Sequence, residues 1–165
     1  MNYTDEIWEI YQNSFPENER RSYKKQKQVM NNPIYSIKPI VHNDLIGFIA
    51  TWELSKFTFV EHFALKDNER GKGYGTNFLK EFITNNRKSI ILEVELPDTK
   101  DAMRRIEFYK KLSFHLNEFE YYQPALNENT SKIPLLIMSY PYKLEKSQFV
   151  VIKDELYEKV YNNCY

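Results

Sequence analysis

The sequence predicts a single α/β domain built around a mixed sheet. The chain has 165 residues, a length that suits one domain. Segments with the period of two expected of strands alternate with segments whose apolar residues recur at helical spacing. Three of the four glycines fall within residues 71–75, between a strand pattern and a helix pattern. The expected element order is ααβββαβαββ, followed by a short C-terminal extension.

The N-terminal part is expected to form two helices and a hairpin. Residues 4–13 carry apolar side chains at helical spacing, and a polar helix is expected from about Glu17 to Met30, because Pro33 follows. Strands are expected at residues 35–41 and 45–54. Asn43 and Asp44 between them have turn chemistry, which predicts a hairpin.

Strands and helices alternate through the middle of the chain. Phe57–Leu65 is rich in aromatic and β-branched residues at a period of two, which predicts a strand. The helix after it presents one apolar face, formed by Tyr74, Phe78, Leu79, Phe82 and Ile83. Ser89–Glu95 predicts a further strand, and Asp98 or Thr99 is expected to cap the next helix. Strands at residues 114–122 and 133–142 then flank a polar loop.

The last segment, residues 144–165, lies outside the expected core domain of residues 1–143. Gln148–Ile152 could form a strand, and Leu156 with Val160 indicates one more helix. We expect this extension to pack on the domain or at an interface. An apolar tail of this kind also makes a homodimer possible.

The turn from Asn68 to Thr76 predicts an anion-binding site. Glycine can adopt positive φ and lets the backbone approach a ligand, and the first N–H groups of the following helix have no partner within that helix. A phosphate satisfies such donors, helped by the helix dipole. Neither the G-x-G-x-x-G dinucleotide fingerprint nor the G-x-x-x-x-G-K-[ST] P-loop is present in this chain.

The pattern that does fit is R-x-x-G-x-G, at Arg70, Gly73 and Gly75. With it, the chain resembles the GNAT superfamily of N-acetyltransferases, whose acetyl-CoA pyrophosphate site carries this motif. The run from Phe108 to Phe114 is similar to the F-Y-x-x-x-G-F signature of the same family. Ser113 stands where the family usually has glycine, which predicts a strained left-handed helix end. The resemblance extends over about residues 4–142.

This resemblance implies a GNAT-like fold, with a mixed, mainly antiparallel central sheet flanked by helices. The activity that it implies is direct transfer of an acetyl group from acetyl-CoA to a primary amine of a small molecule or peptide. It also implies that the two N-terminal helices border the substrate cleft. The strand end Phe63–Leu65 would hold the pantetheine arm and acetyl oxygen through its backbone, with Leu65 the best candidate for the acetyl contact. The expected cofactor-binding residues are Phe63, Ala64, Leu65, Arg70, Gly71, Lys72, Gly73, Tyr74, Gly75 and Thr76. For Tyr74, only the backbone N–H is expected to face the ligand.

Two catalytic residues are expected from this reading. Tyr109 matches the motif tyrosine and is a candidate general acid for the departing thiolate, although it is equally a core aromatic at helical spacing. Glu61 is the candidate general base. By strict alternation Glu61 and His62 face opposite sides of their strand, with Glu61 beside Phe59 and Phe63, so at most one of them addresses the cleft.

Other residues leave alternatives open at the acceptor side. His62 could be a base or a hydrogen-bonded core residue. Glu93 and Glu95 share one face of their strand and can form an acidic wall that attracts an amine. No metal is expected, because His42, His62 and His115 are scattered and lack ligand spacing.

The composition narrows the range of partners. The formal net charge is zero, which gives no basic field for nucleic acid, and the run from Arg20 to Lys27 is interpreted as a solvated helix face. The single cysteine, Cys164, allows no internal disulfide and agrees with a cytoplasmic location. No apolar run approaches the roughly 18 residues of a membrane span, so no membrane partner is expected.

Two other functions compete with amine acetylation. One is a CoA-binding sensor or interaction module without catalysis. The other is an enzyme that transfers a different acyl group, or transfers it to a hydroxyl. Binding of acetyl-CoA without turnover would favour the sensor.

Overall fold

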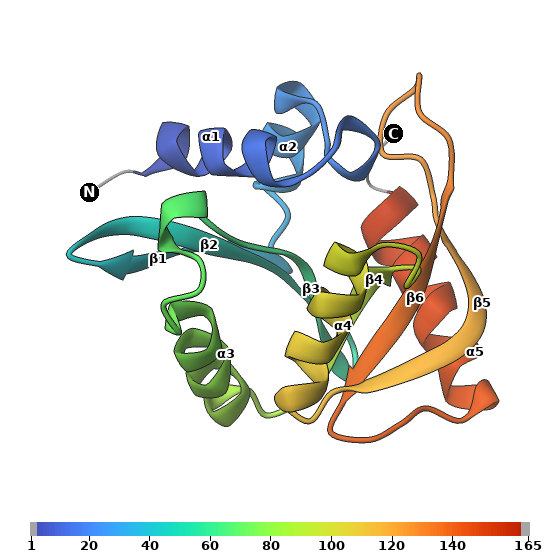
Figure 1. Ribbon diagram of the computed structural model, residues 1–165. Coiled ribbons are helices and arrows are strands. Elements are labelled where there is room, and N and C mark those ends of the chain that lie inside the picture. Colours follow the sequence, from blue (N-terminus) through green and yellow to red (C-terminus); the bar gives the residue numbers. More distant parts are fainter. Residues whose placement is uncertain (1–2, 163–165) are drawn as a thin grey trace.

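The fold is a six-stranded mixed sheet with helices on both faces (Figure 1). The computed structural model describes residues 3–162. The strand order is β1-β2-β3-β4-β6-β5, and only β3 and β4 run parallel. The strands are β1 (Tyr35–His42), β2 (Asp44–Glu53), β3 (Phe57–Leu65), β4 (Ser89–Glu95), β5 (His115–Gln123) and β6 (Ile133–Tyr140). The helices are α1 (Thr4–Ser14), α2 (Tyr23–Val29), α3 (Tyr74–Asn85), α4 (Lys100–Lys111) and α5 (Lys146–Glu155). The predicted fold class and element order are confirmed, with α5 added at the end.

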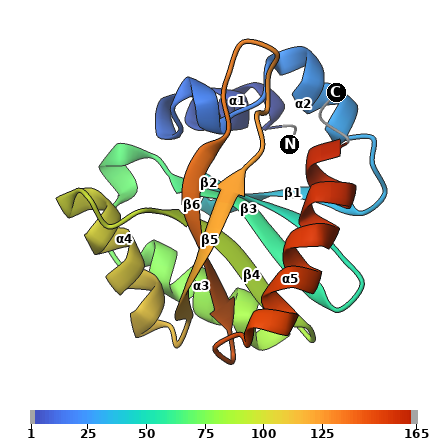
Figure 2. The same cartoon turned by 90° about the vertical axis from the view of Figure 1, so that its right-hand side faces the viewer.

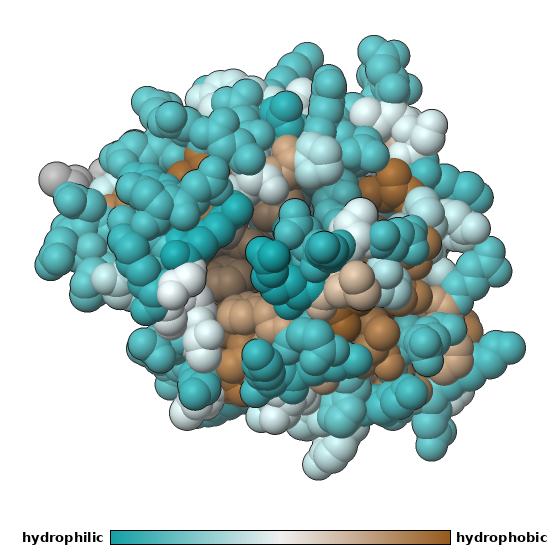
Figure 3. Space-filling view, viewed as in Figure 1, coloured by the Kyte–Doolittle hydropathy of each residue, from teal (hydrophilic) through white to brown (hydrophobic). Residues whose placement is uncertain are grey.

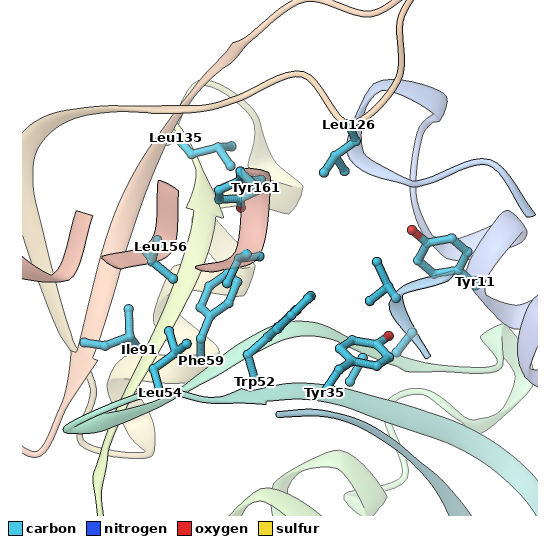
Figure 4. Packing of buried hydrophobic residues seen from close by; sticks show 14 of the residues in the cluster. Tyr11, Tyr35, Trp52, Leu54, Phe59, Ile91, Leu126, Leu135, Leu156 and Tyr161 are labelled. Carbon is cyan, nitrogen blue, oxygen red and sulfur yellow. The ribbon is translucent and has the colours of Figure 1, made fainter. Parts of the chain in front are cut away.

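The two faces of the sheet carry separate hydrophobic cores. Residues of α3 and α4 pack on one face, while those of α1, α2 and α5 pack on the other, as Figure 2 shows for α5. Figure 4 shows part of the second core, which brings residues of α1 and the C-terminal helical segment over the same strands. The first and last helical segments, α1 and η3 (Leu156–Tyr161), thus share one core with the sheet.

The strands β3 and β4 separate after a short parallel pairing. Their register runs only from Phe57 opposite Ser89 to Val60 opposite Leu92. On its other side, β3 continues to pair with β2, but the register skips Glu61: Thr51 faces Val60 and Ala50 faces His62. This is a β-bulge, which bends a strand and changes where its side chains point. The sheet therefore opens between the ends of β3 and β4.

The polar helix predicted from Glu17 to Met30 is broken in the structure, so that prediction was wrong in its extent. A short 3₁₀ turn, η1 (Glu17–Glu19), comes first, Arg20 is extended, and α2 begins after its cap Ser22. Asn127 of the β5–β6 loop holds this break by accepting from the Ser22 N–H and donating to the Arg20 carbonyl. The break turns Arg21 inward, where only 1% of its surface is exposed. The interpretation of this run as a solvated face is therefore wrong for Arg21.

The C-terminal extension is helical throughout its described part. The strand predicted at Gln148–Ile152 is wrong: these residues lie in α5, which begins with a capping box between Glu145 and Gln148. A π-helical turn, η3 (Leu156–Tyr161), follows and confirms the helix expected around Leu156 and Val160. Cys164 lies outside the described residues.

The end of α4 confirms the expected left-handed residue. Ser113 has φ of +68°, and its N–H and that of Phe114 donate to the carbonyls of Lys110 and Tyr109. This pair of bonds is the Schellman motif, in which glycine normally occupies the position of Ser113.

Replacing Ser113 by glycine is expected to stabilise the protein by about 1 kcal/mol, because it relieves a Cβ clash in the left-handed region. Urea denaturation of both proteins measures this difference. Ser113→Ala keeps the Cβ and is the control; it should bring no gain. An equal gain in both variants would show that the hydroxyl, and not the backbone, carries the strain.

Candidate active site

The opening between β3 and β4 is the mouth of a pocket of about 730 Å³. Its walls come from β3, the glycine turn, β4, α4 and the segment after α1. Figure 3 shows the hollow on this face of the molecule, with a hydrophobic floor and a hydrophilic rim. A concave site with an apolar floor and few polar groups is typical of ligand binding.

The glycine turn presents backbone donors to this pocket. Gly71 and Gly73 have φ of +74° and +84°, and no atom would lie within 4 Å of a Cβ added to either. Gly73 caps α3 without a side-chain bond, and the first helical hydrogen bond runs from Asn77 N–H to its carbonyl. The amides of residues 74–76 therefore precede the helical ladder and are available to an anion.

The predicted cofactor-binding residues do not all contribute in the same way. Phe63, Ala64, Leu65, Arg70, Gly71, Gly73, Gly75 and Thr76 line the pocket, whereas Lys72 and Tyr74 do not. Lys72 pairs with Glu69, and the Tyr74 ring packs 4.5 Å from the ring of His42. Arg70 Nε donates to the Leu65 carbonyl over 3.2 Å and so ties the turn to the end of β3. Tyr74 can thus offer only its backbone.

These features fit a ligand with a diphosphate and an extended arm. The diphosphate would meet the free amides of the turn. Beyond Val60, the edge of β3 that faces β4 pairs with no strand among residues 3–162, so its backbone groups can bind an extended chain.

Tyr109 lies on the face of the sheet covered by α3 and α4. It is 7% exposed, packs against the rings of Phe108 and Phe114, and lines the pocket. Burial raises the pKa of Tyr109 to about 12. Its hydroxyl is therefore protonated at neutral pH and can act only as a proton donor there.

Glu61 and His62 lie on the same side of β3, which corrects the prediction that they face opposite sides. The bulge at Glu61 interrupts the period of two, so Glu61 shares a face with Phe59 and His62 and not with Phe63. The Nδ1 atom of His62 lies 3.7 Å from Glu61 Oε2. Both side chains point away from α3 and α4.

Glu61 forms a buried ion pair with Arg21. Arg21 Nη1 donates to its Oε2 over 2.8 Å, Nη2 donates to Oε1, and Trp52 Nε1 donates to Oε2 over 3.0 Å. Burial alone would raise the pKa of Glu61, but the Arg21 guanidinium and these hydrogen bonds hold it below its usual value. A carboxylate with a low pKa and both oxygens occupied is a weak base, which disfavours the catalytic role predicted for Glu61.

His62 is enclosed by aromatic rings and the chain before α2. Its ring lies 4.8 Å from that of Tyr11 and 4.6 Å from that of Phe15, and Nε2 lies 3.1 Å from the Glu19 carbonyl oxygen. Burial lowers the pKa of His62, so the ring is neutral at neutral pH. This environment matches the hydrogen-bonded core residue that the sequence left as an alternative.

Glu93 stands apart from the other carboxyl groups of the pocket. Tyr121 and Tyr161 both donate to its Oε1, each over 2.5 Å. Burial raises the pKa of Glu93 to about 7, although these two hydrogen bonds act to lower it. Glu95, two residues further on, pairs with Arg105 over 3.3 Å. Glu93 is therefore a carboxyl group of the pocket whose pKa is raised to about 7, near neutral pH.

Sequence reasoning missed the partners of both glutamates. Arg21 lies in a run of basic residues directly after Arg20, and no local signal distinguishes it from its neighbours. Tyr121 and Tyr161 are two of 13 tyrosines, with no local pattern that links them to Glu93. Only the fold brings these residues together.

Residues 3–162 contain no group of three His, Cys, Asp or Glu side chains that could hold a metal ion. In the same part of the chain, no helix is long and apolar enough to cross a membrane.

Comparison with known proteins identifies the family. Residues 4–114 match the acetyltransferase (GNAT) family. A GNAT-family acetyltransferase from Bacteroides thetaiotaomicron is 32% identical, with a TM-score of 0.90 over 96% of this chain and 92% of that one. A search of curated proteins finds no match.

More distant structures share the fold. The ribosomal-protein-S18-alanine N-acetyltransferase from Escherichia coli is 16% identical, with a TM-score of 0.61 over 86% of this chain and 91% of that one. A GNAT acetyltransferase from Elizabethkingia anophelis with acetyl-CoA bound is 13% identical, with a TM-score of 0.53 over 72% of this chain and 82% of that one. The chain described here belongs to the acetyltransferase (GNAT) family and is an N-acetyltransferase that uses acetyl-CoA.

Proposed function

We propose that this enzyme transfers the acetyl group directly to a primary amine of a small molecule or peptide, with Glu93 as general base. The observation that carries the proposal is the opening between β3 and β4, which has a proton donor on one face and a proton acceptor on the other. Tyr109 lies on the α3 and α4 face, and Glu93 contacts residues of the opposite core. Donor and acceptor can thus flank a single reaction centre.

Acetyl-CoA supplies the activated acetyl thioester when it is bound. The amides of residues 74–76, with Gly71 and Gly73, would hold its diphosphate, and the free edge of β3 at residues 63–65 would hold its arm. Arg70 supports this arrangement because it links the turn to Leu65. The side chain of Lys72 pairs with Glu69 and does not line the pocket, so it is not part of the proposed site.

Glu93 takes the place that the sequence suggested for Glu61. An amine attacks only when neutral, so its ammonium form must lose a proton in or before the site. A base with a pKa near 7 is partly ionised at neutral pH and still basic enough to accept that proton. Glu19 also lines the pocket, where burial raises its pKa, and Glu95 lies beside it. Arg105 offsets the charge of Glu95, so it is Glu19 and Glu93 that favour a cationic acceptor.

Replacing Tyr109 by phenylalanine is expected to lower kcat by about 10-fold or more while acetyl-CoA affinity stays nearly unchanged, because only a proton donor is lost. Steady-state kinetics and calorimetric titration measure the two quantities. Tyr140→Phe is a matched control, since Tyr140 packs on Phe114 in the same core. Unchanged turnover in Tyr109→Phe would remove this tyrosine from the mechanism.

The class of reaction is tested by titrating the protein with acetyl-CoA and assaying acetylation of a panel of amines. Binding with turnover on an amine supports the proposal. Binding without turnover on any acceptor would point to a CoA-binding sensor. Turnover only with another acyl-CoA, or only on hydroxyl acceptors, would point to a different transferase.

A further inference from the structure

We propose that Tyr161, from the C-terminal segment, is a positioning residue that acts with Tyr121 to fix the Glu93 carboxyl group for proton transfer. This inference rests on the function proposed above for Glu93. It gives α5 and η3, which lie beyond the family match at residues 4–114, a part in the chemistry.

Two hydroxyl groups from different elements meet at one carboxylate oxygen. Tyr121 comes from β5 and Tyr161 from η3, and both donate to Glu93 Oε1. Within the described part of the chain, no hydrogen bond is formed to Oε2. Because Glu93 lines the pocket, Oε2 is the oxygen left to take a proton from an acceptor.

Both tyrosines are buried and packed against a third tyrosine. Tyr161 and Tyr121 are 1% and 2% exposed, and both pack against the ring of Tyr157. Figure 4 shows Tyr161 on the C-terminal helical segment, in the same cluster as Leu135 and Leu156. A catalytic group is positioned well when its supporting side chains are themselves locked by packing.

The C-terminal segment is anchored in a way that sets the position of Tyr161. The Glu155 carboxylate accepts from the N–H and the hydroxyl of Ser55, over 2.8 and 2.7 Å. The helix then widens into the π-turn, in which Val160 and Tyr161 are both buried although they are consecutive. Single π-turns occur frequently at functional sites. Here the turn places both side chains in the same core, and the Tyr161 hydroxyl reaches Glu93.

The charges around Glu93 determine what the tyrosines do. Glu61 and Glu19 face it and favour its neutral form, whereas the two hydroxyl groups stabilise its ionised form. Glu61 is paired with Arg21, and on the neighbouring helix Arg105 is paired with Glu95. Loss of the Tyr161 hydroxyl therefore removes a group that favours the ionised base, and the pKa of Glu93 should rise.

The test compares Tyr161→Phe with wild type in two measurements. One is the titration of Glu93 in the free enzyme, monitored by NMR of carboxyl-labelled glutamate. The Glu93→Gln variant identifies the Glu93 signal. The other is the pH profile of kcat/KM. We expect both midpoints to move upward by about one pH unit, so that activity falls about 10-fold at pH 6 and recovers above pH 9.

Tyr157→Phe is the matched control. It removes a hydroxyl from the same turn, but this hydroxyl donates to the Tyr122 carbonyl and not to Glu93. It should leave both midpoints in place. Tyr121→Phe is a second variant on Glu93 and should move them in the same direction as Tyr161→Phe.

The outcomes separate this inference from the function on which it rests. An NMR midpoint that stays at the wild-type value in both Tyr161→Phe and Tyr121→Phe overturns the positioning role. A raised NMR midpoint with an unmoved kinetic profile upholds the contact with Glu93 but overturns Glu93 as the base. A loss of activity that is equal at every pH also overturns the inference, since it reports damage to the fold.

Discussion

Replacing Glu93 by glutamine is expected to lower kcat by about 100-fold or more, the usual effect of removing a general base. Glutamine keeps the carbonyl oxygen that Tyr121 and Tyr161 bind, so the two hydrogen bonds can persist. It cannot accept the amine proton. Steady-state kinetics with a saturating amine substrate measures the loss.

The pH dependence should change together with the rate. In wild type, kcat/KM should rise with pH until Glu93 is ionised, with a midpoint near its pKa of about 7. This rising limb of the profile of kcat/KM against pH should be missing in Glu93→Gln. Glu120→Gln changes the charge equally at an exposed site and should keep both the rate and the limb. A residual limb in Glu93→Gln would assign the base elsewhere.

Stability provides the check that a slow variant is still folded. The folded pKa of Glu93 is raised from 4.5 to about 7, so its contribution to stability is present below pH 4.5 and lost as the pH rises through 7. Glu93→Gln should therefore match wild type near pH 4.5 and be more stable at pH 8. The difference is at most about 3 kcal/mol, and less where pocket water solvates the carboxylate.

The parts of this molecule that sequence predicts well are those set by neighbouring residues. The positive φ of Gly71 and Gly73 and the left-handed Ser113 follow from local steric rules. The strand, turn and helix around Gly73 follow from local periodicity. The local structure of the glycine turn, which we propose binds the diphosphate, could therefore be anticipated from the sequence, whereas the side chains of Lys72 and Tyr74 do not line the pocket.

The acceptor half depends on contacts between distant parts of the chain. Arg21 binds Glu61 across 40 positions, and Tyr161 binds Glu93 across 68. The bulge at Glu61 also defeats the rule of alternation, because one extra residue moves its neighbours to the other face. Local patterns carry no information on such pairings, so the sequence alone predicts the base at Glu61, whereas the structure supports our proposal of Glu93.

The prediction of a strand in the C-terminal segment is wrong for a related reason. Gln148–Ile152 contains consecutive β-branched residues, which favour a strand. The capping box at Glu145 and the burial of Phe149, Leu156 and Val160 on one side favour the helix instead. Tertiary packing outweighs a propensity difference of about 1 kcal/mol or less per residue.

Glu93→Gln should stabilise the protein above neutral pH, but replacing Glu61 by glutamine should destabilise it. The free energy of unfolding at pH 7 should fall by about 3 kcal/mol. The side chains of Glu61 and Arg21 are 3% and 0% exposed, so the guanidinium would lose the carboxylate that binds both of its terminal nitrogens. Glutamine can accept only part of these bonds and brings no charge. Urea denaturation measures the loss.

Glu107→Gln is the matched control, because it breaks an exposed ion pair with Lys110 and should cost less than about 1 kcal/mol. The pH dependence gives a second check. The folded pKa of Glu61 lies below its unfolded value of 4.5, so its contribution is present above pH 4.5 and lost as the pH falls through the folded value. The deficit of Glu61→Gln should therefore shrink on acidification, whereas the gain of Glu93→Gln grows on alkalinisation. If Glu61→Gln instead kept wild-type stability but lost the pH-dependent limb of kcat/KM, Glu61 would be the base and Glu93 a structural group.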